Sequence, residues 1–490
     1  YLMMADKSKE ASIDGLNQLF RVSKTSENRT GIESLVTNVS DVGDFVLGRI
    51  DITSIVEKIQ TGVDKYPETM TFLESVEKLR GAYLNNKYFD HDLNYRACKA
   101  CQFKTTEENQ NQKKSGFKEC WKKKLKWTDA DFKKPSTFEI WNFRKGGRLF
   151  NEEKKIFLSD IDEEDVGIVS EIGKLSASER QWIQIDKAVR EDDTISVLKS
   201  LLKKEMDTWV YPLHFIDFET SSVALPFHQG RTPYEQIAFQ FSHHILHKDG
   251  NVEHKDEYLH FQPGVFPNFE FVRALKVALS DDKGTIFKYS NHENSILNAI
   301  NSQLQNSNEP DKDQLQSFIK EITHSKRDSV EEWSGDRDMV DLCEVVKKYY
   351  YNPLMGGSNS IKAVLPAIMT SSEFVKEKYI KSIGEIGVSS LNFPDTHIWL
   401  DEINGKVISP YKKLPGLFRD WTDEQLDEVV SDLYKIDNGG AALTAYGKLQ
   451  YTNMGEEERN ELSASLKQYC ELDTLAMVMI FEHFKELTES

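Results

Sequence analysis

Two acidic motifs, far apart in the chain, carry residue types that could bind a divalent cation. The first is Asp217-Phe218-Glu219, at the end of an apolar segment. Side chains alternate along a strand, so both carboxylates of an Asp-x-Glu strand point to the same side. In the second, Tyr469 and Asp473 lie four residues apart in a segment with a helical pattern and therefore share one helix face. Together these side chains predict an oxygen-rich site for a hard cation, with a hydroxyl left to position water.

A third acidic residue lies where a predicted strand passes into a predicted helix. Glu293 follows the strand expected at Thr285 to Tyr289. From such a junction a side chain can reach a cleft at the strand ends, so we predict Glu293 as a further ligand. Asp341 begins another helix, and we expect it to cap that helix rather than to bind the cation.

Two basic side chains near these motifs are candidate contacts for a phosphate. Ser358 or Ser360 can cap a helix that carries Lys362 on its first turn. Lys362 and His292 could each contact a phosphate or polarise water. For both residues a purely structural role is the alternative.

Length and composition limit the class of protein. The chain has 490 residues, enough for two or three domains, and its 39% hydrophobic content can support buried cores. The net charge of -18 argues against a protein that coats nucleic acid with its whole surface, although a local basic patch can still bind a phosphate backbone. Five cysteines do not make a disulfide scaffold in so long a chain, and we find no membrane span or secretory signal. We therefore expect a cytoplasmic protein without a membrane partner. It opens on Tyr1 rather than Met, as a fragment would.

Three regions are predicted along the chain. Residues 1–135 form a helical module that ends in a Cys- and Lys-rich block, 136–205 form a connecting α+β segment, and 206–490 form an α/β domain. The connecting segment includes a strand-like piece at Phe138 to Trp141 and a helix at Thr194 to Met206. The polar segment 306–314 is expected to be a loop. In the last region the expected elements are strands at Phe215 to Phe218, Gln236 to Leu246, Glu257 to Phe261 and Thr285 to Tyr289, and helices at Phe269 to Leu279 and Glu293 to Leu304. Their order predicts a mixed sheet flanked by helices.

The cysteine block is a second candidate metal site. Cys98-x-x-Cys101 brings two thiolates to one cation, and Cys120 follows after a lysine-rich loop. Three sulfurs are one short of a closed Zn²⁺ or 4Fe-4S site, and His91 is a candidate fourth ligand. Buried cysteines without a metal are the alternative.

The densest positive charge surrounds the same block. Lys122, Lys123 and Lys124 follow Trp121, with Trp127 close behind. Lysines neutralise phosphates and tryptophans can stack on bases, so this run is a candidate surface for guiding a nucleic-acid strand. A solvated surface without a ligand is the alternative.

The ordered set of motifs resembles known families. The acidic motifs resemble those of DEDD exonucleases of the tyrosine subtype, which have a ribonuclease-H-like fold. More closely, the chain is similar to a bacterial family known as domain of unknown function 2779. The cysteine spacing resembles the iron-sulfur staple of RecB-type nucleases, which would place a fourth cysteine upstream of Tyr1 and make residues 1–135 the remnant of such a domain. Each motif alone is weak evidence for the family, but five motifs in the correct order are hard to obtain by chance. The similar strings are Ile216 to Thr220, Pro233 to Gln236, Phe239 to Ser242, Ser358 to Pro366 and Tyr469 to Met477, within a resemblance from about Tyr211 to Leu487.

The resemblance implies a 3′-to-5′ exonuclease that hydrolyses phosphodiester bonds with two Mg²⁺ or Mn²⁺ ions about 4 Å apart. It implies Asp217, Glu219 and Asp473 as metal ligands, and Tyr469 as the residue that orients or helps to deprotonate water. DEDD enzymes generally have Asp where this chain has Glu293. The alternative is a catalytically impaired nucleic-acid-binding or scaffold protein with the same fold. The expected substrate is a single-stranded or 3′-ended nucleic acid, and the sequence does not distinguish DNA from RNA.

Overall fold

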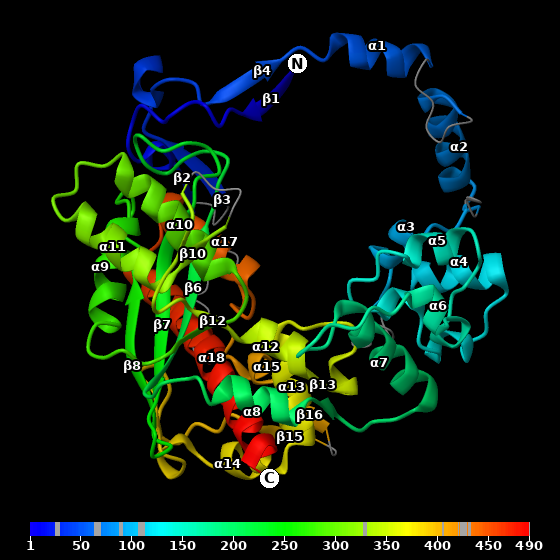
Figure 1. The fold of residues 1–490 in the computed structure, drawn as a ribbon. Helices are drawn as coiled ribbons and strands as arrows, with labels where there is room; N and C mark the ends of the chain where they lie inside the picture. The colour runs from blue at the N-terminus through cyan, green and yellow to red at the C-terminus, as the bar shows by residue number, and fades with distance from the viewer. Residues whose placement is uncertain are drawn as a thin grey trace. The chain divides into compact units, whose positions relative to one another are not determined.

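The computed structural model describes residues 1–24, 30–62, 70–87, 92–105, 113–326, 331–403, 406–419, 421, 429 and 433–489. Its internal contacts define two compact units (Figure 1). Unit 1 comprises Tyr1–Glu10, Phe45–Glu139 and Phe143–Asp165. Unit 2 comprises Ala11–Asp44, Ile140–Asn142 and Val166–Ser490. None of the described helices is long and apolar enough to cross a membrane.

Unit 2 is built on a six-stranded mixed sheet with the order β12-β9-β6-β7-β8-β14. Strands β6, β7 and β8 pair antiparallel, whereas β9 is parallel to β6, β12 is parallel to β9, and β14 is parallel to β8. The predicted mixed α/β sheet is therefore confirmed. The strands are β6 Leu213–Ser221, β7 Ile237–Leu246, β8 Val252–Leu259, β9 Ile286–Lys288, β12 Val340–Asp341 and β14 Val388–Ser389.

Helices cover both faces of this sheet, and each face has its own hydrophobic core. Ile216 and Phe218 of β6 pack with α9 (Asn268–Ala278), α10 (His292–Gln305) and α11 (Lys312–Ile322). Phe215 points to the other face, where α18 (Glu456–Glu489) packs. Every residue of α18 from Tyr469 to Phe484 is buried, so this helix crosses the interior of unit 2. The alternation along β6 thus places Asp217 and Glu219 on the α18 face.

Further elements complete unit 2, and Figure 1 shows several of them around α18. Two predictions need correction. The helix expected at Thr194 to Met206 begins only at Lys199, because Ser196–Val197 pairs with a strand instead. The segment 306–314 is not all loop, since α11 begins at Lys312.

The remaining elements are β2 Phe20–Lys24, β3 Thr30–Ser34, α7 Ala177–Arg190, β5 Ser196–Val197, α8 Lys199–Met206, β10 His324–Ser325, β11 Trp333–Ser334, α12 Leu342–Tyr349, β13 Tyr350–Tyr351, α13 Ile361–Ser371, α14 Glu373–Tyr379, β15 Asp401–Ile403, β16 Lys406–Ile408, α15 Pro410–Lys413 and α17 Gly439–Tyr451.

An aromatic cluster around Tyr95, Phe117, Trp121 and Phe150 forms the core of the part of unit 1 between residues 93 and 156. The strand-like piece expected at Phe138 to Trp141 is instead a 3-10 turn at Thr137–Glu139. The backbone N–H of Trp141 donates to the Gln184 side chain at 3.0 Å rather than to a neighbouring strand. The elements of this unit are β1 Leu2–Ala5, β4 Leu47–Ile50, α1 Thr53–Thr61, α2 Phe72–Leu84, α3 Tyr95–Lys99, α4 Gly116–Leu125 and α5 Gly146–Asn151, with α6 Glu163–Val166 at the boundary.

Candidate metal centre

Three of the predicted acidic residues meet in unit 2. Carboxylate oxygens of Asp217, Glu219 and Asp473 lie within 4.8 Å of one another. Asp217 and Glu219 are two residues apart on β6, just before a register shift between Glu219 and Thr220. Asp473 comes from α18, which lies against that face of the sheet. The fold therefore joins the two motifs that lie far apart in the sequence.

Glu293 is the fourth acidic residue of this region. It lies on the first turn of α10, and its side chain is buried with no hydrogen-bond partner for Oε2 among the described residues. Its charge contributes to raising the pKa of both Asp217 and Glu219, so it acts on the same small volume. Its oxygens are not part of the three-residue group within 4.8 Å, and the structure thus places Glu293 at the edge of the cluster.

Burial and mutual repulsion make these carboxylates poor anions when they are alone. Desolvation, followed by the charges of Asp473, Glu219 and Glu293, raises the pKa of Asp217 well above its usual range. The pKa of Glu219 is raised to about 8 by burial and by Asp473, and that of Glu293 to about 8 mainly by burial. Burial also raises the pKa of Asp473. A buried group of like charges is stable as anions only with a compensating cation.

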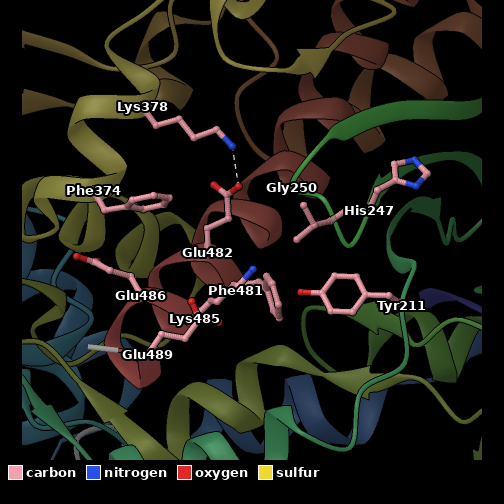
Figure 2. A pocket seen from close by; sticks show the side chains of 11 residues that line it. Tyr211, His247, Gly250, Phe374, Lys378, Phe481, Glu482, Lys485, Glu486 and Glu489 are labelled. Atoms are coloured by element: carbon pink, nitrogen blue, oxygen red, sulfur yellow. Dashed lines mark hydrogen bonds and ion pairs between the residues drawn. The ribbon is translucent and has the colours of Figure 1, made fainter.

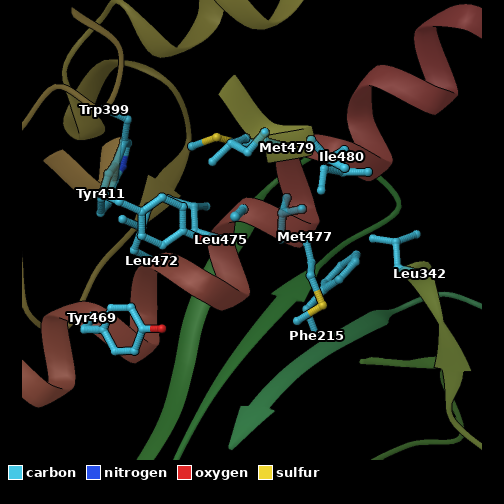
Figure 3. Packing of buried hydrophobic residues seen from close by; sticks show 14 of the residues in the cluster. Phe215, Leu342, Trp399, Tyr411, Tyr469, Leu472, Leu475, Met477, Met479 and Ile480 are labelled. Carbon is cyan, nitrogen blue, oxygen red and sulfur yellow. The ribbon is translucent and has the colours of Figure 1, made fainter. Parts of the chain in front are cut away.

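Hydroxyl and ammonium groups line the α18 side of the cluster. Tyr411 on α15 donates a short hydrogen bond to Asp473 Oδ1, and Tyr469 also hydrogen-bonds to Asp473. Lys362 Nζ donates to the Tyr469 hydroxyl at 3.0 Å and to the Asp437 backbone carbonyl at 2.9 Å. Figure 3 shows Tyr469 on α18 and Tyr411 beside the buried residue Leu472 of the same helix. The ammonium of Lys362 lies 4.7 Å from the ring centroid of Tyr469 and is thereby fixed next to the acidic cluster.

Sequence reasoning missed Tyr411. It lies in the short helix Pro410–Lys413, which follows β16, and no motif surrounds it. Its role follows only from the contact with Asp473, because the two residues meet through tertiary packing.

The neighbouring polar residues have structural partners. Asp341 is the N-cap of α12 and accepts hydrogen bonds from the backbone N–H groups of Cys343 and Glu344, as expected. Ser360 caps α13, which carries Lys362 on its first turn. His292 Nε2 lies 3.0 Å from the Thr220 hydroxyl. The His292 side chain is exposed on the first turn of α10, so this contact links α10 to β6, and a contact of His292 with phosphate stays a prediction.

The donor set fits Mg²⁺ or Mn²⁺. The grouped ligands are all carboxylate oxygens, which hard divalent cations prefer, and no sulfur or imidazole nitrogen belongs to the group. The partnerless oxygen of Glu293 is a further donor at its edge. Asp217, Glu219 and Asp473 would hold the ions, and Glu293 would complete the shell.

The cysteine block of unit 1 is arranged differently. Cys98, Cys101 and Cys120 all pack against the aromatic cluster, and none is in a disulfide. In the described part of the chain, they do not form a group with three ligand atoms within 4.8 Å. His91 lies outside the described residues.

Trp121 requires a correction. Its side chain is only 1% exposed and packs on Trp127, with ring centroids 4.5 Å apart. A buried indole cannot stack on a base, so Trp121 is part of the core of unit 1. Phe117 and Trp121 lie four residues apart on the inner face of α4, whereas Lys122 and Lys123 are exposed. The i,i+4 spacing of these aromatic residues was the available sequence signal.

A cavity of about 480 Å³ lies elsewhere in unit 2 (Figure 2). Its lining includes Tyr211, Phe374 and Phe481, and the ion pair between Lys378 and Glu482 at 2.7 Å. None of the four acidic residues Asp217, Glu219, Glu293 and Asp473 lines this cavity. The acidic cluster and the cavity therefore lie at separate places in unit 2.

Comparison with known protein families finds a match for part of unit 2. Residues 214–360 form a DUF2779 domain, a domain of unknown function. This range contains Asp217, Glu219 and Glu293, whereas Tyr469 and Asp473 lie beyond the DUF2779 segment and join it through α18. No curated protein and no solved structure matches the chain.

Proposed function

We propose that this protein is a metal-dependent 3′-to-5′ exonuclease that hydrolyses phosphodiester bonds of DNA or RNA. The observation that carries the proposal is the meeting of carboxylate oxygens of Asp217, Glu219 and Asp473 within 4.8 Å, in a group where Glu219 and Asp473 are buried and Asp217 is half-buried. A mixed sheet with the acidic pair on an interior strand is the architecture expected for a ribonuclease-H-like fold and supports the same proposal. Two bound Mg²⁺ or Mn²⁺ ions would stabilise the charges on the attacking and leaving oxygens.

The residues of the chain have separate roles in this proposal. Asp217, Glu219 and Asp473 hold the ions, because each offers a carboxylate that burial leaves in need of positive charge. Tyr469 keeps its proton, since burial and the acidic neighbours raise the pKa of its phenol. Its hydroxyl therefore positions water as a hydrogen-bonding group rather than as a base. Lys362 holds that hydroxyl in place by donating a hydrogen bond to it at 3.0 Å.

A nuclease assay with purified protein tests the proposal. The substrates are single-stranded DNA and RNA with a 3′ hydroxyl, with either end labelled, in Mn²⁺, Mg²⁺ or EDTA. We expect release of mononucleotides from the 3′ end in the presence of the metal only. Binding without hydrolysis on every substrate would favour the non-catalytic nucleic-acid-binding alternative.

Removal of the Tyr469 hydroxyl is expected to slow the reaction. In Tyr469→Phe the water loses a hydrogen-bonding group but the ligands stay, so kcat should fall about 10- to 100-fold with little change in KM. The matched control is Tyr446→Phe, because the Tyr446 hydroxyl is buried without a hydrogen-bond partner among the described residues. Steady-state kinetics in Mn²⁺ measure both, and an equal loss in the two variants would contradict the role of Tyr469.

Charge reversal on α4 is expected to weaken nucleic-acid binding. Replacing Lys122, Lys123 and Lys124 by Glu should weaken binding to a single strand at least about tenfold and lower the slope of log Kd against log[salt] by about 2, since each phosphate contact contributes about 0.7. The ion pairs of Lys122 with Asp129 and of Lys124 with Asp92 are at the surface and contribute little to stability.

The control for this triple variant carries the same change of charge elsewhere. Lys248, Lys326 and Lys381 are exposed lysines of unit 2, and all three are replaced by Glu. Fluorescence anisotropy over a salt series measures binding of both proteins. Equal affinities for the two triple variants would show that α4 is only a solvated surface.

A further inference from the structure

A second group of potential metal ligands lies beside the acidic cluster and takes no part in it. Ligand atoms of His244, His254 and Glu471 lie within 4.8 Å of one another, and all three residues are buried. His244 is on β7, His254 is on β8, and Glu471 is on α18. The group therefore connects two adjacent strands to the helix that also carries Tyr469 and Asp473.

We assign one nitrogen of each imidazole as a donor from the buried hydrogen-bond network that starts at the Thr474 hydroxyl. Thr474 donates its hydroxyl proton to the backbone carbonyl of Glu471 at 3.0 Å, as helical threonines do. Its oxygen can then only accept from His244 Nδ1, at 2.7 Å, and from Ser242 Oγ, at 2.9 Å. The Ser242 oxygen in turn accepts from His254 Nε2 at 3.0 Å. This assignment leaves His244 Nε2 and His254 Nδ1 as nitrogens with lone pairs.

These two lone pairs and a carboxylate lack sufficient hydrogen-bond donors. His244 Nε2 and Glu471 Oε1 are fully buried and have no hydrogen-bond partner among the described residues. His254 Nδ1 lies 3.0 Å from Glu471 Oε2 and accepts only a 3.3 Å hydrogen bond from the Leu391 backbone. Lone pairs facing a buried carboxylate repel one another, so the arrangement is costly without a positive charge.

Nearby donors satisfy only the other oxygen of Glu471. Asn392 donates its backbone N–H and its side-chain amide to Oε2, at 3.2 and 2.9 Å. The neighbouring Lys467 pairs with Glu257 at 2.7 Å instead. The two imidazole rings stack nearly parallel with centroids 4.6 Å apart, and one nitrogen of each ring lies within 4.8 Å of the other and of a Glu471 oxygen.

We propose that His244, His254 and Glu471 bind a structural divalent cation of the zinc class. Two neutral imidazoles and one carboxylate are ligands that Zn²⁺ favours, and each imidazole is oriented by a hydrogen bond from its other nitrogen, as in known metal sites. Because the site is buried and shares α18 with Asp473, the cation ties this helix to β7 and β8. The proposal stands independently of the nuclease reaction, since none of the three residues is a ligand in the acidic cluster.

Metal analysis of purified protein tests this site. Thiolates also bind zinc, so the parent protein for the test carries Cys98→Ser, Cys101→Ser and Cys120→Ser. After loading with one equivalent of Zn²⁺ and dialysis against Mg²⁺, we expect about one zinc per chain by mass spectrometry, and a higher Tm than after EDTA treatment. Addition of Asp217→Asn should leave the zinc content unchanged, which separates this site from the acidic cluster.

The decisive variants are His254→Gln and its matched control His243→Gln. His243 is a buried neighbour on β7, but it contacts His214 and Asp256 instead of the proposed site. We expect loss of zinc and of its effect on Tm in His254→Gln, and retention of both in His243→Gln. Absence of tightly bound zinc from the parent, or equal zinc content in the parent and His254→Gln, would overturn the proposal.

Co²⁺ substitution in the parent gives a readout that needs no substitution at the proposed site itself. A site with two imidazoles and one carboxylate in near-tetrahedral geometry should give intense visible absorption from Co²⁺, without thiolate charge-transfer bands. Only the weak spectrum of six-coordinate Co²⁺ would contradict the site.

Discussion

Asp217→Asn is expected to lower metal-dependent hydrolysis of a 3′-ended oligonucleotide by at least about 10³-fold. The carboxylate of Asp217 lies within 4.8 Å of those of Glu219 and Asp473, and its replacement removes one charge from the site that would hold both ions. A loss of about 4 kcal/mol of transition-state stabilisation corresponds to this factor. The measurement is the single-turnover rate in saturating Mn²⁺. The double variant Asp217→Ala with Glu219→Ala should have no measurable activity.

The control for this prediction is an acidic residue outside the cluster. Asp336 is exposed, and Asp336→Asn makes the same chemical change at the surface of unit 2. We expect its rate to match that of the unmodified protein. Hydrolysis that persists in the double variant would rule out the acidic cluster as the active site.

Removal of divalent cations is expected to make stability fall as the pH rises. The pKa values of Glu219 and Glu293 are raised to about 8 in the folded protein, above the ordinary value of 4.5. Between these limits the folded state binds more protons than the unfolded state, so the free energy of unfolding decreases with pH. The free energy of unfolding falls by up to about 1.4 kcal/mol per pH unit for each carboxylate. This decrease ends once the pH is above the pKa of the carboxylate in the folded protein.

Measurements between pH 7 and 8 isolate this effect. Burial lowers the pKa of His214 and His228 to about 4, so stability gained from these histidines rises with pH only up to about 6.5. Urea unfolding in EDTA should therefore show a decreasing midpoint from pH 7 to 8. In saturating Mn²⁺ the carboxylates are ionised ligands at both pH values, and the decrease should disappear.

The combined variant Glu219→Gln with Glu293→Gln tests the cause of the pH dependence. Neutral amides cannot titrate, so the decrease of the midpoint in EDTA from pH 7 to 8 should become smaller, and the part that remains belongs to carboxylates such as Asp217, whose pKa is also raised by burial. An unchanged slope in this variant would assign the effect to other groups. Titration of the unmodified protein with Mn²⁺ at pH 7 should in addition release protons, which a weakly buffered indicator assay measures.

Local patterns were sufficient for most elements of the α/β domain. The ten-residue strand β7 coincides with the predicted strand almost to the residue, since Ile237, Phe239 and Phe241 alternate with other residues and aromatic and β-branched side chains favour a strand. The N-cap Asp341 was predicted, and Ser360 was one of two candidates for the next cap, because a capping side chain bonds to its own helix. Prediction was poorer where a tertiary partner decides. Ser196–Val197 pairs with β13 instead of extending α8, and a strand partner so far away in sequence leaves no local signal.

The amino-acid sequence by itself determined that Asp217 and Glu219 share one face of a strand, because the alternation of side chains is a property of the backbone. It likewise determined that Tyr469 and Asp473 share one face of a helix. Only the tertiary structure decided that these faces meet, that Tyr411 and Lys362 complete the polar lining, and that Trp121 is buried rather than available to a base. The same holds for His244, His254 and Glu471. Such contacts depend on strand register and on how α18 packs across the sheet, and these features are set by the whole core rather than by any short segment.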